Sequence, residues 1–176
     1  MTDLLFSQVL LFGSNEGSLH LPEGLSKALI GFHSGWRYII LIVLILAIVF
    51  GYQTSKGKKP FLGGTQKAGF FTMLAVDIQF VVGAILYFFF IAGQTNFKIG
   101  KLTDQLGSPM FRTIALDHAV LMFIALIFIH IGYSKAKKAR NVVDAGKKQF
   151  VWMLIALILI LIGIPWPFLH HERGWV

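Results

Sequence analysis

The chain has 176 residues, with 16 Lys plus Arg, 8 Asp plus Glu, no cysteine and 56% hydrophobic residues. Charged residues make up 14% of the chain, against about a quarter in a soluble domain, and the mean hydropathy is +0.71. This composition excludes a soluble nucleic-acid-binding protein despite the net charge of +8, and the lack of cysteine excludes disulfide scaffolds and thiolate metal sites.

Residues 1–27 form a tail that precedes the strongly apolar part of the chain. The apolar stretch Leu4–Phe12 is short, no basic residue precedes it, and no small-residue cleavage site follows it. These features do not indicate a secretory signal. We expect a periplasmic tail whose apolar residues lie on the membrane surface or contact a partner.

Four apolar blocks are long enough to cross a bilayer as helices, which takes about 20 residues. The predicted spans are 28–52, 68–92, 110–133 and 150–169. The pair Ser108-Pro109 favours the start of the third helix, and the prolines in Pro165-Trp-Pro167 favour the end of the fourth. Residues 93–108, between the second and third spans, are predicted to form a polar loop. The sequence therefore predicts an all-α membrane protein in which residues 28–176 form a four-transmembrane-helix bundle.

Basic residues concentrate on one side of these spans. The links after the first and third spans hold ten basic residues and one acidic residue: Lys56, Lys58, Lys59, Lys67, Lys135, Lys137, Lys138, Arg140, Lys147, Lys148 and Asp144. The segments on the other side hold five of each sign: Lys27, Lys98, Lys101, Arg112 and Arg173 with Asp3, Glu16, Glu23, Asp104 and Glu172. The positive-inside rule predicts a multi-pass membrane protein with both termini outside and the two basic links in the cytoplasm.

Ionisable side chains inside a membrane span are costly, and they commonly mark function. In the outer half, these residues are His33 and Arg37 of the first span with Asp117 and His118 of the third. At about 1.5 Å per helical residue, Arg37 and Asp117 lie at similar depths. The simplest interpretation of these two charges is an ion pair that joins the two helices.

Two histidines on different helices are the ligands that a b-type haem needs within a helix bundle. His33 and His118 are the candidates, with estimated depths that differ by about 5 Å. One alternative pairs His118 with His170 or His171, and in another each histidine only forms hydrogen bonds within the bundle. The adjacent residues His170, His171 and Glu172 also suggest a surface metal site, although adjacent ligands are a weak signal for one.

The inner half contains Asp77 and His130. A carboxylate and an imidazole exchange protons near neutral pH, so these residues suggest a proton path or a quinone pocket. For Asp77 itself the preferred interpretation is structural, with the side chain held neutral or hydrogen-bonded by Gln79 or by a neighbouring helix. The sequence has no nucleophile elbow or phosphate loop, and so gives no support to a hydrolase or an ATP-driven machine.

Five stretches of the sequence resemble one family. They are Phe32–Tyr38, Asp77–Tyr87, Asp117-His118 followed by Ile129–Lys138, Gly163–Phe168, and Arg173–Trp175. These stretches resemble the small four-span bacterial membrane proteins, common in Bacteroidetes, that are labelled cytochrome b or cytochrome-b-like. The resemblance covers residues 29–176 and implies a quinone-linked respiratory context, with His33 and His118 as the matching residues.

The leading hypothesis is a membrane subunit that takes part in respiratory electron transfer, rather than a stand-alone enzyme. In it, His33 and His118 ligate one haem b, while Arg37 and Asp117 tune its potential or hold the bundle. A second hypothesis is a haem-free accessory or scaffold subunit that packs against other membrane subunits of a larger complex. A third is a proton-coupled transporter that uses Asp77 and His130.

Overall fold

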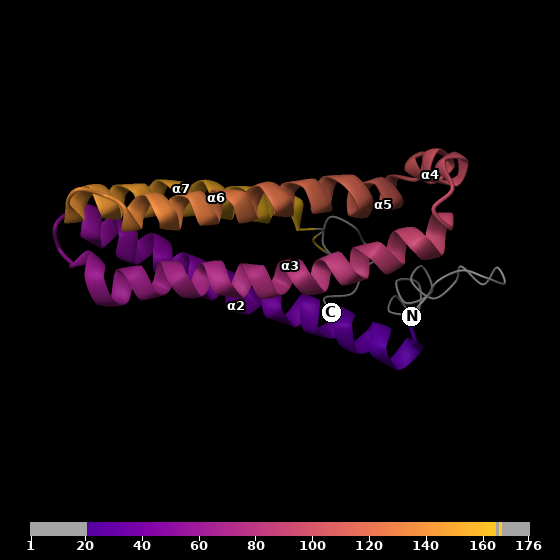
Figure 1. Ribbon diagram of the computed structural model, residues 1–176, viewed down its shortest axis with the longest axis horizontal. Helices are drawn as coiled ribbons and strands as arrows, with labels where there is room; N and C mark the ends of the chain where they lie inside the picture. Colours follow the sequence, from indigo (N-terminus) through magenta and orange to yellow (C-terminus); the bar gives the residue numbers. More distant parts are fainter. Residues whose placement is uncertain (1–20, 165, 167–176) are drawn as a thin grey trace. The chain divides into compact units, whose positions relative to one another are not determined.

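A computed structural model of the protein describes residues 21–164 and residue 166. Over these residues the chain is helical and has no strand. Four helical segments are long and apolar enough to cross a membrane: Glu23–Ser55, Phe61–Thr95, Thr113–Lys137 and Val142–Gly163 (Figure 1). The predicted all-α class with four membrane-spanning helices is confirmed. The predictions for Leu4–Phe12 and for His170, His171 and Glu172 lie outside the described residues.

The helical elements follow one another with short connections. In chain order they are α2 (Glu23–Ser55), the kinked turn η1 (Phe61–Thr65), α3 (Gln66–Thr95), α4 (Ile99–Leu106), α5 (Pro109–Arg112), the π-helical turn η2 (Thr113–His118), α6 (Ala119–Lys137) and α7 (Val142–Gly163). The start of α5 at Pro109 agrees with the predicted helix start, because proline suits the first helical position.

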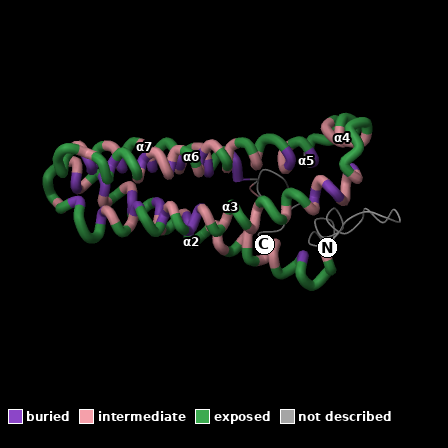
Figure 2. The backbone as a smooth tube through the Cα atoms, viewed as in Figure 1, coloured by how far each residue is buried: buried purple, intermediate pink, exposed green. Residues whose placement is uncertain are grey.

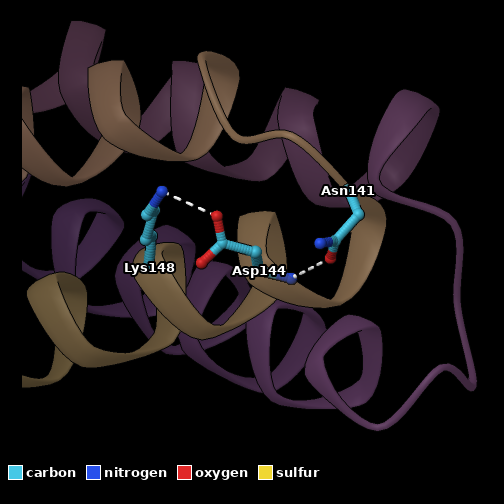
Figure 3. A network of polar contacts seen from close by, with 3 residues as sticks. All are labelled: Asn141, Asp144 and Lys148. Carbon is cyan, nitrogen blue, oxygen red and sulfur yellow. Dashed lines mark hydrogen bonds and ion pairs between the residues drawn. The ribbon is translucent and has the colours of Figure 1, made fainter.

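The fourth helix is displaced from its predicted range of 150–169, because α7 begins at Val142 and ends at Gly163. The side chain of Asn141 accepts a hydrogen bond of 2.8 Å from the backbone N–H of Asp144, which caps the helix. Lys148 then pairs with the Asp144 carboxylate at 2.7 Å, and Figure 3 shows both contacts. These polar residues extend the helix beyond its apolar block.

The segment 93–108 was predicted to be a polar loop, but it contains helix α4. Leu102 and Leu106 are four residues apart and so share a face of this helix. Both pack against the buried cluster around Phe90 and Phe111. The prediction was wrong because these two leucines are enough to dock one short helical stretch.

The chain divides into two compact units. Unit 1 consists of Met1–Gly35, Val81–Val120 and Ile164–Val176, and unit 2 of Trp36–Phe80 and Leu121–Gly163. In both units, buried positions recur between exposed ones along the helices, as Figure 2 shows. Each unit has its own internal packing and its own candidate site.

Unit 2 packs parts of α2, α3, α6 and α7 through small residues and one buried amide. A Cβ added at Gly51 of α2 would lie 2.9 Å from the backbone nitrogen of Phe150 in α7, so these two helices approach backbone to backbone. The fully buried Gln149 donates from Nε2 to the carbonyls of Ala47 and Thr65, at 3.1 and 3.0 Å. This amide ties α7 to α2 and to η1, directly before α3.

Unit 1 has an aromatic core. The rings of Phe90 in α3 and Phe111 in α5 stack with their centroids 5.2 Å apart, and both residues are buried together with Ala115. The hydroxyl of Tyr87 donates a hydrogen bond of 3.1 Å to the carbonyl of Ala115. This bond attaches the π-helical turn η2 to α3.

Candidate functional site

Unit 1 brings His33 of α2 and His118 of η2 together. Their ring centroids are 6.2 Å apart and the ring planes are inclined at 74°. Both residues are half-buried. The depth difference of about 5 Å that residue counting gives therefore does not separate the two side chains.

The π-helical turn η2 holds Asp117 and His118 at its end. A π turn inserts an extra residue into a helical turn, and such turns often occur at functional sites. The bond from Tyr87 to the Ala115 carbonyl holds this turn from the side of α3. A regular α-helix would point the His118 side chain in another direction, so the π turn determines the direction of the imidazole ring.

Gly83 of α3 provides the space beside His33. A Cβ at this position would lie 2.9 Å from the Cε1 atom of His33, a distance that side-chain carbons do not adopt. The absence of a side chain at Gly83 therefore allows the imidazole to pack against the α3 backbone. Three helical segments of unit 1 together determine the position of the histidine pair.

The spacing of the two rings fits joint ligation of one metal centre. Imidazole nitrogen bonds a metal at about 2 Å, so two rings bonded from opposite sides have centroids roughly 6 Å apart. The observed separation is 6.2 Å, and the rings come from different helices, as a haem site in a bundle requires. A ring-to-ring contact without metal falls within the same range of distances. The residues present fit a bis-imidazole haem site.

Arg37 and Asp117 fall in different units, Arg37 in unit 2 and Asp117 in unit 1. Within unit 2, an Nη atom of Arg37 donates to the Tyr38 hydroxyl at 3.1 Å, and the guanidinium lies 4.9 Å from the centroid of the Tyr38 ring. Asp117 is exposed at the surface of unit 1. The ion pair between these two residues stays a prediction.

Unit 2 contains the second candidate site, a contact between Asp77 of α3 and His130 of α6. The Nε2 atom of His130 lies 3.3 Å from Oδ1 of Asp77. The two side chains are 39% and 41% exposed, so the pair reaches the outer surface of the unit. The predicted inner cluster of a carboxylate and an imidazole is thus present as a direct contact.

The same imidazole also contacts the backbone of its own helix. Nδ1 of His130 lies 2.9 Å from the carbonyl oxygen of Leu126, one turn earlier in α6. Both ring nitrogens of His130 are therefore in contact, one with α6 itself and one with Asp77 of α3.

Aromatic rings flank this pair on both sides along α3 and α6. Phe80 and Phe123 have centroids 5.9 Å apart, and Phe70 and Tyr133 have centroids 6.2 Å apart. The polar pair therefore lies between two aromatic contacts on the same pair of helices.

Two parts of these sites were not anticipated from the sequence. The π turn has no reliable residue signature in the sequence. The role of Gly83 was also missed, since a glycine in an apolar span does not indicate which side chain it makes room for. Across the described part of the chain, no three His, Cys, Asp or Glu residues gather as a metal site would require, so both sites are pairs.

No protein-family model, no curated protein and no solved structure matches this chain.

Proposed function

We propose that this chain is a b-type-cytochrome-like subunit of a bacterial inner membrane and takes part in quinone-linked respiratory electron transfer. Four helices capable of spanning a membrane support the location. The observation that carries the proposal is the approach of the His33 and His118 rings to 6.2 Å in unit 1. A pair of imidazoles from two helices is what axial ligation of one haem requires.

In this proposal His33 and His118 hold the haem, which when bound supplies one-electron chemistry. Gly83 keeps the space that the His33 ring needs, and Tyr87 holds η2 against α3. Phe90 and Phe111 form a buried cluster with Ala115 of η2, three residues before His118. The protein thus provides ligands, their orientation and an apolar surrounding, and the charge of Asp117, next to His118 in the chain, adjusts the potential.

In this proposal Asp77 and His130 form the proton-exchanging part of a quinone site. Its support is the 3.3 Å contact between Nε2 of His130 and Oδ1 of Asp77, together with the partial exposure of both side chains. A quinone gains or loses protons when its redox state changes, and a carboxyl and an imidazole are groups that can give or take a proton.

The test is a reduced-minus-oxidised absorption spectrum of the purified full chain. We expect b-type bands in the wild type and their loss in His33→Ala and His118→Ala. His130→Ala is the matched control, because it removes an imidazole from a span and leaves the pair in unit 1 intact. A wild-type protein without these bands would contradict the proposal, and so would variants of His33 and His118 that keep them.

A second candidate function is a haem-free accessory subunit of a larger membrane complex. Gly31 and Gly35 of α2 have the small-xxx-small spacing that lets membrane helices approach closely. Among the described residues, a Cβ added at either glycine meets no heavy atom within 4 Å apart from its chain neighbours and the backbone of its own helix. The accessory role places a helix of another protein in this space.

Affinity purification from the native membrane distinguishes this candidate. It predicts a larger assembly without b-type bands, which Gly31→Leu and Gly35→Leu would dissociate. Gly93→Leu in α3 is the control, because a Cβ there also meets open space among the described residues. A coloured protein that purifies alone and stays stable would refute the accessory role.

A further inference from the structure

A groove opens on unit 2 at the end of α2, next to the basic link between α2 and α3. Its volume is about 580 Å³. Its lining combines apolar and polar side chains: Ile48, Val49, Tyr52, Gln53, Lys58 and Phe150. The rings of Tyr52 and Phe150 lie 5.5 Å apart, so one wall comes from α2 and the other from α7.

The backbone holds Lys58 at this groove. Gly57 adopts the left-handed conformation, with φ of +70°, and its N–H donates to the carbonyl of Thr54 at 3.0 Å. The N–H of Lys58 donates to the carbonyl of Gln53, also at 3.0 Å. These two bonds form the Schellman ending of a helix, which folds the chain back over its last turn. These two bonds therefore fix the backbone of Lys58 next to the groove.

The surroundings of the groove carry excess positive charge. Lys56 lies with its Nζ 5.6 Å from the centroid of the Tyr52 ring. Lys147 is exposed and stands one helical turn before Phe150, on the same side of α7. The nearby carboxylate of Asp144 is already paired with Lys148 at 2.7 Å. The groove thus has positively charged side chains near it, while the carboxylate of Asp144 is already neutralised by Lys148.

We propose that this groove binds an anionic phospholipid, with its phosphate at Lys58 and an acyl chain along Ile48, Val49 and Phe150. The apolar wall belongs to a helix capable of crossing the membrane, so lipid chains reach it, and Lys58 lies where that helix ends. Basic sites between helices at a membrane edge are typical sites for acidic headgroups. A soluble anion would leave the apolar wall without an occupant. This site is independent of the histidine pair and of the function proposed above.

The experiment measures the binding of spin-labelled phosphatidylglycerol and phosphatidylcholine to the full chain in phosphatidylcholine bilayers, by electron paramagnetic resonance. We expect the wild type to prefer phosphatidylglycerol by about five-fold, the scale of one lysine near an acidic lipid. Lys58→Gln should abolish most of this preference. Lys138→Gln is the matched control, because it removes an equal charge from an exposed position of the other basic link.

A second variant separates the wall of the groove from its charge. Val49→Trp fills the groove without changing the net charge, and should also lower the binding of phosphatidylglycerol. Equal binding of the two lipids by the wild type would overturn the proposal. Equal losses in Lys58→Gln and Lys138→Gln would do so as well, because diffuse charge would then explain the preference. Inorganic phosphate that displaces the lipid completely, or a change in oligomeric state with Val49→Trp, would assign the groove to another occupant.

Discussion

The side-chain amide of Gln149 donates a hydrogen bond of 3.1 Å to the backbone carbonyl of Ala47, 102 residues earlier in the chain. The same nitrogen donates to the carbonyl of Thr65 at 3.0 Å, and the residue is completely buried. One amide in α7 thus links two other helical segments of unit 2. In a region where lipid supplies no competing hydrogen bonds, this contact specifies which helices are neighbours.

Replacing Gln149 by methionine should destabilise the protein by about 1 kcal/mol, because it removes two interhelical hydrogen bonds at similar side-chain volume. The measurement is unfolding by sodium dodecyl sulfate in mixed micelles, followed by far-UV circular dichroism. Gln53→Met, at a half-buried position, should have a smaller effect. If both variants lost the same stability, the amide of Gln149 would have no special role.

Gly146→Ala should destabilise unit 2 by about 1–3 kcal/mol, the usual cost of overpacking. A Cβ at this position would lie 2.7 Å from the carbonyl carbon of Thr54, and backbone atoms cannot move aside as a flexible side chain can. Gly24→Ala is the control, because the described residues leave open space there. Alanine favours a helix, so this control should be neutral or slightly stabilising in the same unfolding assay.

Gly83→Val should lower the b-type absorbance per mole of protein by about 10-fold, the scale of losses when a group that orients a metal ligand is disturbed. The valine side chain would occupy the space of the His33 ring. Gly93→Val, in the same helix, carries the same change in helix propensity without that contact. If Gly83→Val left the absorbance unchanged, haem binding would not depend on the packing of His33 against Gly83.

Asp77→Asn should slow the reduction of the haem by a quinol roughly 100-fold, the scale of a lost acid–base group, while the b-type spectrum stays the same. The asparagine keeps the size of the side chain but cannot exchange a proton with His130. Stopped-flow absorbance measures the rate. Asp104→Asn, an exposed change in α4, should leave the rate as in the wild type. An unaltered rate in Asp77→Asn would leave the Asp77–His130 contact with a structural role only.

The four long helices could be predicted from the sequence because an apolar block of about 20 residues has few ways to satisfy its backbone except as a helix in lipid. Their ends could not be predicted as well. The first turns of α7 include Asp144 and Lys148, which hydropathy assigns to a loop, although their ion pair and the cap from Asn141 stabilise helix.

The candidate residues could be identified from the sequence, because polar side chains within spans are rare and conspicuous. Their geometry could not. Counting residues placed His33 and His118 at different depths, but the π turn before His118 and the packing of the His33 ring against Gly83 are tertiary features that residue counting does not capture. The contact of His130 with Asp77 likewise depends on the register between α3 and α6, and no local sequence signal determines that register.

The position of Asp77 also relates this residue to the membrane potential. It lies 11 residues after the start of α3 at Gln66, or about 16 Å along the helix, so it stands within the electric field across the bilayer. Moving one elementary charge across the whole field is worth about 2.3 kcal/mol per 100 mV. A proton that reached Asp77 in the proposed quinone site from one side of the membrane would cross a part of that field. Under that proposal, proton exchange at Asp77 and His130 depends on the membrane potential.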